Sequence, residues 1–203
     1  MLLPYHNIDK IEAGCDEAGR GPLAGPVFAA AVIWPQNLLI NEIRDSKKLN
    51  EKQRIKLHSL IEENAIDYAV SMVSESEIDK INILNASILA MHNSLSELRD
   101  DFNFILVDGN RFKAYGEIEY ETIVKGDDKY LSIAAASILA KFYRDEHMLQ
   151  LHKIYPQYGW NTNKGYPTKK HIEAIQKYGI CEFHRKSFCK KFLIDQPILF
   201  ENT

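Results

Sequence analysis

Four carboxylates stand at the ends of predicted strands in this chain, and they are the residues best suited to chemistry: Asp16, Glu17, Asp108 and Asp127. Ligand sites in open α/β sheets lie just beyond strand ends, so these side chains are expected to converge. Gathered carboxylates repel one another unless some are protonated or cations neutralise them. Hard oxygen ligands with no histidine motif nearby favour Mg²⁺ or Mn²⁺ over zinc. Two such ions can hold the attacking water and the leaving oxygen of a phosphodiester in line.

One local feature complicates this site. Asp16 and Glu17 are adjacent, and adjacent residues of a regular strand point to opposite faces of the sheet. We therefore expect the strand geometry to break at this point, where Gly14 and Gly19 make a break plausible.

The elements that must position these carboxylates alternate along the chain. Strands are predicted at residues 11–15, 27–34, 68–73, 104–107 and 117–124, with an irregular Gly- and Pro-rich segment at 18–26. Helices are predicted at 50–64, from Ser74 past Met91, at 132–150, and between Thr168 and Gly179. This alternation predicts an α/β sheet covered by helices.

Length and composition agree with one globular unit. A chain of 203 residues is long enough for one well-cored domain and too short for two of ordinary size. No run of about 20 apolar residues is present to span a membrane, and no secretion signal precedes the first strand, so we expect a cytoplasmic protein. Nothing demands more than a monomer.

The net charge argues against a protein that binds nucleic acid through overall positive charge. The formal net charge is −3, but lysines and arginines cluster at residues 44–56, 164–170 and 185–191. Such clusters contact phosphates or form ordinary solvated helix faces. Cys181, His184 and Cys189 match none of the common zinc spacings, and we expect reduced thiols.

Several motifs carry a resemblance to a known family. Residues 16–26 read DEAGRGPLAGP, which closely resembles the signature of the type 2 ribonucleases H (ribonuclease HII). Further matches follow in the family's order: DSKKL at 45–49, VDG at 107–109, KGD at 125–127, AAASILAK at 134–141, RD at 144–145, KGY at 164–166 and HRKSF at 184–188. The resemblance spans nearly the whole chain.

The resemblance implies a ribonuclease H-like fold. It would be a mixed central sheet flanked by helices, one catalytic domain over 1–203 in which residues from about 165 to 203 form a small helical C-terminal extension. It also implies an endonuclease that cuts the RNA strand of RNA/DNA hybrids and cuts 5′ to single ribonucleotides in duplex DNA. Hydrolysis with two metal ions, Mg²⁺ or Mn²⁺, would leave a 3′-hydroxyl and a 5′-phosphate, as needed for ribonucleotide excision and RNA primer removal.

The same resemblance assigns roles to particular residues. The family's four metal-binding carboxylates fall on Asp16, Glu17, Asp108 and Asp127, with Asp128 as a competing neighbour of the last. The substrate-binding residues that it implies are Gly19, Arg20, Gly21, Lys47 and Tyr166. The Gly-Arg-Gly backbone would read the ribose 2′-hydroxyl, Lys47 would contact a phosphate, and Tyr166 would pack on the sugar at the RNA-to-DNA junction. Lys141, Arg144 and Asp145 share one helix with i, i+4 spacing, which fits either a structural ion pair or a catalytic role, and we do not include them in the site.

Residues 196–200 read QPILF and partly resemble the peptides by which repair enzymes dock on a replication sliding clamp. The proline departs from the usual pattern, and an apolar tail packing on the body is the alternative interpretation.

Two other functions compete with the hybrid-cutting nuclease. The first is another nuclease of the same fold, such as a junction resolvase or integrase, against which the Gly-Arg-Gly segment and Tyr166 argue. The second is a catalytically silent nucleic-acid-binding module, against which the presence of all four acidic positions argues.

Overall fold

The computed structural model of this protein describes residues 2–43 and 51–193, and its centre is a mixed sheet of strand order β3-β2-β1-β4-β5. The strands are β1 (Glu12–Ala18), β2 (Val27–Ile33), β3 (Asp67–Val73), β4 (Phe104–Asp108) and β5 (Glu119–Ile123). β1, β2 and β3 pair antiparallel, whereas β1, β4 and β5 pair parallel. The predicted α/β class with a mixed sheet is confirmed.

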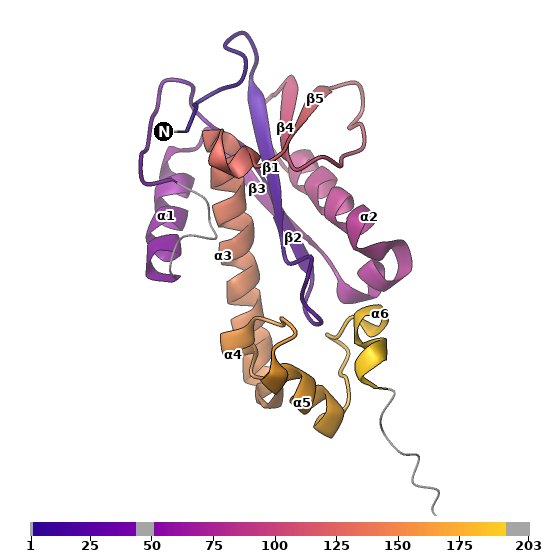
Figure 1. Ribbon diagram of the computed structural model, residues 1–203. Helices are drawn as coiled ribbons and strands as arrows, with labels where there is room; N and C mark the ends of the chain where they lie inside the picture. Colours follow the sequence, from indigo (N-terminus) through magenta and orange to yellow (C-terminus); the bar gives the residue numbers. More distant parts are fainter. Residues whose placement is uncertain (1, 44–50, 194–203) are drawn as a thin grey trace, which may run out of the picture.

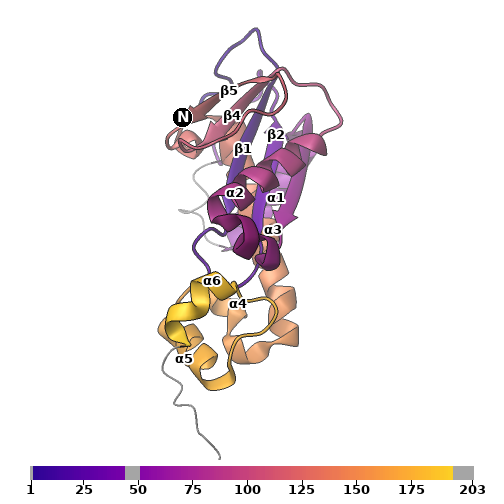
Figure 2. The ribbon, with the colours of Figure 1, turned by 90° about the vertical axis from the view of Figure 1, so that its right-hand side faces the viewer.

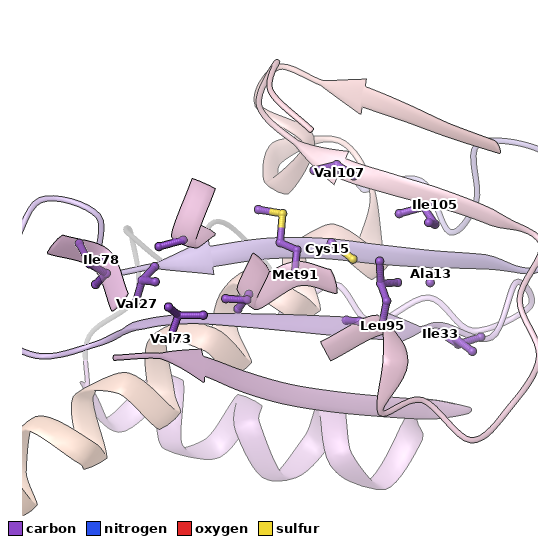
Figure 3. Close-up of a cluster of buried hydrophobic side chains, with 14 residues drawn as sticks. Ala13, Cys15, Val27, Ile33, Val73, Ile78, Met91, Leu95, Ile105 and Val107 are labelled. Carbon is purple, nitrogen blue, oxygen red and sulfur yellow. The ribbon is translucent and has the colours of Figure 1, made fainter. Parts of the chain in front are cut away.

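Helices cover both faces of this sheet (Figure 1). They are α1 (Glu51–Asn64), α2 (Glu75–Ser96), α3 (Leu131–Ile154), α4 (Trp160–Asn163), α5 (Lys169–Tyr178) and α6 (Lys186–Cys189). α2 packs on one face, and its Met91 and Leu95 lie over Cys15 of β1 (Figure 3). α1 and α3 pack on the other face, where the alanines at 134–136 of α3 lie against the sheet. Small side chains let that helix approach closely.

β1 presents alternate residues to these two layers. Ala13 and Cys15 belong to the cluster under α2. Gly14 faces α3, because a Cβ atom there would overlap the main chain and side chain of Ser132. By the same alternation Asp16 projects toward α3 and Glu17 toward α2.

Local sequence signals placed most element ends correctly. Ser74 caps α2 by accepting a hydrogen bond from the Glu77 N–H at 3.3 Å, as its capping pattern predicts. Thr168 caps α5 in the same way, and Gly179 ends it with φ 76°. A kink was not predicted: Asn82 inside α2 has φ 67° and ψ 164°, a conformation that side-chain-bearing residues rarely adopt.

The C-terminal helices pack on the half of α3 that extends beyond the sheet (Figure 2). Their core holds Trp160 and Ile175, both fully buried, together with Leu23 from the loop between β1 and β2. None of the helices in 2–43 and 51–193 is long and apolar enough to cross a membrane.

Candidate active site

The tip of β1 extends past the end of its neighbour β4. The last pair between the two strands joins Cys15 and Val107, whereas Asp16 and Glu17 continue to pair with β2. The strand stays regular at this point, so the predicted break in strand geometry is wrong. Both side chains nevertheless line one pocket, because β4 ends at Asp108 and does not pair with the tip of β1.

That space is a pocket of about 330 Å³. Its walls come from the β1 tip and the loop after it, from the end of β4, and from α1, α3 and the segment before α5. The lining residues are Asp16, Glu17, Ala18, Gly19, Arg20, Gly21, Arg54, Asp108, Ser137, Lys141 and Tyr166. Three of the four predicted carboxylates and four of the five predicted substrate contacts therefore meet here, and the remaining contact, Lys47, lies outside the described residues.

Asp16 is the most buried of the three carboxylates in the pocket wall, at 5% exposure. Burial raises its pKa well above the ordinary value, and the negative charges of Glu17 and Asp108 raise it further. A hydrogen bond from the Glu17 N–H to Oδ1 at 2.7 Å opposes this shift. Like charges thus crowd at the β1 tip, which is the electrostatic situation that a bound cation relieves.

The other two carboxylates are held by protein donors. Glu17 Oε1 accepts a hydrogen bond from Arg20 Nη1 at 3.1 Å. Asp108 Oδ1 accepts one from the main-chain N–H of Gly126 at 2.7 Å. These contacts orient the two side chains at the pocket.

Asp127 directly follows Gly126 in a 3-10 turn, η2 (Gly126–Asp128), that leads into α3. Its side chain is 4% exposed, whereas that of Asp128 is exposed. Asp127 does not line the pocket, but it directly follows Gly126, whose N–H donates a hydrogen bond to Asp108. Burial therefore distinguishes Asp127 from its exposed neighbour Asp128.

The donor chemistry of the site fits a hard divalent cation. Carboxylate oxygens line the pocket together with a serine hydroxyl, and the lining residues of the described chain include neither a histidine nor a cysteine. Across residues 2–43 and 51–193, no three His, Cys, Asp or Glu side chains gather tightly enough to hold an ion together.

Four of the predicted substrate contacts form another part of the pocket wall. Gly19 has φ 98°, a left-handed conformation that favours glycine, and a Cβ atom there would overlap the side chain of Arg144. Tyr166 is 41% exposed, and its ring lies 3.6 Å from where a Cβ of Gly21 would stand. An aromatic face and exposed main chain thus lie side by side next to the carboxylates.

A buried histidine pair holds the main chain of Tyr166. His171 Nδ1 lies 2.9 Å from the Tyr166 carbonyl oxygen, so this nitrogen carries a proton and donates. His171 Nε2 then accepts from Trp160 Nε1 at 3.0 Å and from His184 Nε2 at 3.3 Å. His184 Nδ1 in turn accepts from the Cys181 N–H at 3.1 Å. Both imidazoles are therefore neutral in the folded protein.

Acid should weaken the fold through this pair. Burial, and then His171, lowers the pKa of His184 from 6.5 to about 4, and burial also lowers that of His171. The unfolded chain then binds more protons, so this contribution to stability is complete above pH 6.5 and is lost as the pH falls toward 4. We expect a loss on the order of 2 kcal/mol, measured by urea unfolding from pH 7 to 4.5.

His184→Gln should flatten that pH dependence relative to the wild type, whereas His92→Gln, at a half-buried position of α2 outside the histidine pair, should not. An unchanged slope in His184→Gln would contradict this assignment.

Two cationic residues in the pocket wall were not predicted as part of the site. Lys141 forms an ion pair with Asp145, as its spacing predicts, yet it also lines the pocket. Arg54 of α1 lies 3.5 Å from Asp145 and lines the same pocket. Arg144, which was grouped with these two residues, takes no part in the ion pair, and its guanidinium donates hydrogen bonds to main-chain carbonyls. The i, i+4 spacing identified the pair but not the direction that Lys141 faces.

Comparison with known proteins places this arrangement among nucleases. A sequence model of the ribonuclease HII family matches residues 13–191. A ribonuclease HII of Parabacteroides distasonis is 59% identical over 188 residues, which cover 93% of this chain and 94% of that protein. The ribonuclease H2 structure from Pyrococcus horikoshii OT3 superposes with a TM-score of 0.76 at 28% identity, covering 89% of this chain and 96% of the other.

Two more distant structures share the fold. A PCNA:RNase HII complex from Archaeoglobus fulgidus has a TM-score of 0.70 at 24% identity, covering 86% of this chain and 93% of the other. Bst-RNase HIII in complex with Mn²⁺ has a TM-score of 0.70 at 20% identity, covering 90% and 69%.

Proposed function

The chain belongs to the ribonuclease HII family, and from this premise we propose how its site works. As a ribonuclease HII it is an endoribonuclease that cleaves the RNA of RNA/DNA hybrids and cleaves at ribonucleotides embedded in DNA. The observation that carries the proposal is that Asp16, Glu17 and Asp108 line one pocket together with Tyr166 and the Gly19–Arg20–Gly21 segment.

Members of this family use divalent metals. We propose that Asp16, Glu17, Asp108 and Asp127 hold two ions, Mg²⁺ or Mn²⁺. When bound, such ions supply an activated water and charge stabilisation at the leaving oxygen. The protein's part is to fix the carboxylates: the Gly126 N–H orients Asp108, and the Glu17 N–H orients Asp16. The products would be a 3′-hydroxyl and a 5′-phosphate.

We assign recognition of the ribonucleotide to the loop after β1 and to Tyr166, which line the same pocket. The main chain at Gly19, Arg20 and Gly21 would contact the 2′-hydroxyl, which is the group that distinguishes RNA from DNA locally. Tyr166, exposed beside it, would pack on the sugar that follows. Lys47, outside the described residues, is proposed to contact a phosphate. The cellular tasks that fit are ribonucleotide excision and RNA primer removal.

The direct test is cleavage of three matched duplexes with Mg²⁺: one carrying a single internal ribonucleotide, one an RNA/DNA hybrid, and one all DNA. We expect one cut 5′ to the ribonucleotide, cuts along the hybrid, and none in DNA. Equal cutting of all three would instead indicate a nuclease of the resolvase kind. No cutting by folded protein with either Mg²⁺ or Mn²⁺ would indicate a binding module.

Tyr166→Ala should separate the two substrates. Loss of an aromatic contact with a nucleotide costs about 1–3 kcal/mol, so cutting at a single ribonucleotide should fall about tenfold or more. Cutting of a long hybrid, which offers many equivalent sites, should fall less than about threefold. The measurement is kcat/KM on both substrates.

Tyr178→Ala is the matched control, since Tyr178 is an exposed tyrosine at the end of α5, away from the pocket. Equal losses on both substrates in Tyr166→Ala would remove the junction-reading role.

A sliding clamp is a further proposed partner. The supporting observations are the QPILF sequence at 196–200, outside the described residues, and the clamp complex of the Archaeoglobus fulgidus relative. Replacing Leu199 and Phe200 by alanine should abolish binding to the purified clamp and leave cleavage of short duplexes intact. Binding that survives the substitutions, or a wild type that does not bind, would refute the proposal.

A further inference from the structure

Two arginines lie wholly buried behind the loop at 19–26. Arg144 of α3 and Arg185, just before α6, are both 0% exposed. In the described part of the chain neither forms an ion pair, and the hydrogen bonds of both go to main-chain carbonyls. The buried carboxylate of Glu75 lies close enough to interact electrostatically with both arginines, and the hydrogen bonds that satisfy their guanidinium groups go to the main chain.

Arg185 divides its donors among three carbonyls of the loop. Nη2 donates to the Gly19 oxygen at 2.6 Å and to the Gly25 oxygen at 2.8 Å. Nη1 donates to the Arg20 oxygen at 2.9 Å, and Nε donates to Gly25 at 3.0 Å. One planar fork thus ties the beginning of the loop to its end.

The hydrogen bonds to these carbonyls also fix the direction in which the N–H groups of the same peptides point. In a planar trans peptide the C=O and the following N–H point in opposite directions. With the carbonyls of Gly19 and Arg20 turned inward to Arg185, the N–H groups of Arg20 and Gly21 turn outward. Both residues line the pocket that holds the carboxylates.

We propose that Arg185 is a positioning residue that aims the Arg20 and Gly21 N–H groups at the ribose 2′-hydroxyl and so sets the selectivity for ribonucleotides. The inference rests on the proposed function, in which this main chain reads the sugar. Arg185 acts through the loop and touches no substrate itself.

Several contacts fix the position of Arg185 and of the residues after it. The Arg185 N–H donates to the Leu23 carbonyl at 2.8 Å. Asp79 of α2 accepts from the N–H groups of Lys186 and Ser187 at 2.8 and 3.0 Å and fixes the start of α6. Arg144 fills the space beside Gly19. The guanidinium therefore has little freedom to follow the loop if the loop relaxes.

Lysine cannot replace this fork. Its ammonium is a point charge on a flexible stem, and it cannot address three separate carbonyls in one plane. Arg185→Lys keeps the positive charge and much of the buried length, but it should release the Gly19 and Arg20 peptides to rotate. In Arg185→Lys, selectivity for ribonucleotides should therefore fall more than the turnover number of the folded enzyme does.

The test measures selectivity rather than rate. A duplex with one ribonucleotide serves as substrate, and the all-deoxy duplex of the same sequence serves as competitive inhibitor, both with Mg²⁺. In the wild type, Ki for the deoxy duplex should exceed KM for the ribonucleotide duplex. In Arg185→Lys that ratio should fall about tenfold, the size of one lost hydrogen bond, mainly through a higher KM.

Leu151→Ala is the control for destabilisation, because Leu151 is buried in the C-terminal cluster and is not one of the residues that line the pocket. It should lower the active fraction, and hence apparent kcat, and leave the ratio unchanged. Three results would overturn the inference. The ratio could be unchanged in Arg185→Lys, or it could fall equally in Leu151→Ala. It could also be near one in a wild type that cuts only the ribonucleotide duplex. A wild type that cuts both duplexes or neither would overturn the proposed function instead.

Discussion

Asp108→Asn is expected to reduce cleavage at a single ribonucleotide by about 10³-fold or more while the protein stays folded. Asparagine retains an oxygen that can accept the Gly126 N–H, so the β4 tip should keep its shape. It lacks the negative charge that a bound cation requires. A loss of about 4 kcal/mol of charge stabilisation in the transition state corresponds to that factor in rate.

The same substitution should make the metal-free protein slightly more stable. Asp108 is one of the charges that raise the pKa of Asp16, so its neutralisation relieves repulsion at the β1 tip. Thermal unfolding should show a Tm equal to or above that of the wild type without metal, and a smaller rise when Mg²⁺ is added. Asp101→Asn, at an exposed position before β4, is the control and should change neither property. Cleavage within tenfold of the wild type would exclude Asp108 as a metal ligand.

The second large effect should distinguish two adjacent carboxylates. Asp127→Asn is expected to lower kcat/KM by about 10²-fold or more, and Asp128→Asn by less than about twofold. Both residues lie in η2, but Asp127 is buried beside the Asp108 contact and Asp128 is exposed. Because the chemistry and the turn are the same, the pair controls for effects on the start of α3. The reverse order of losses would move the fourth ligand to Asp128.

Features that depend on residues close together in the sequence could be predicted, and features that depend on residues far apart in the sequence could not. Helix ends at Ser74, Thr168 and Gly179 depend on neighbours within a few residues, and they were predicted correctly. Asp16 and Glu17 were predicted to need a broken strand. The actual solution depends on where β4 ends, some 90 positions along the chain, which no pattern near Asp16 reveals.

Buried cations were the other failure. Arg185 stands in a basic cluster that was predicted to face phosphates or solvent, yet it is fully buried. Arg144 was grouped with the Lys141–Asp145 ion pair, and its guanidinium instead donates hydrogen bonds to carbonyls of the 24–26 segment and of Lys164. Charge patterns indicate polar partners but do not distinguish a phosphate from a main-chain carbonyl. Only the topology, which returns the C-terminal segment to the β1 tip, decides between them.

The hydrogen bond from Arg185 to the Gly25 carbonyl joins residues 160 positions apart, and this separation has a consequence for synthesis. Chains fold from the N-terminus as they leave the ribosome, at about 5–20 residues per second. The sheet and its carboxylates belong to residues before 130, so they can assemble while the loop at 19–26 still lacks its arginine. A nascent chain at that stage would hold the acidic site without a fixed reader of the sugar, and selectivity for ribonucleotides would be the last property that the protein acquires.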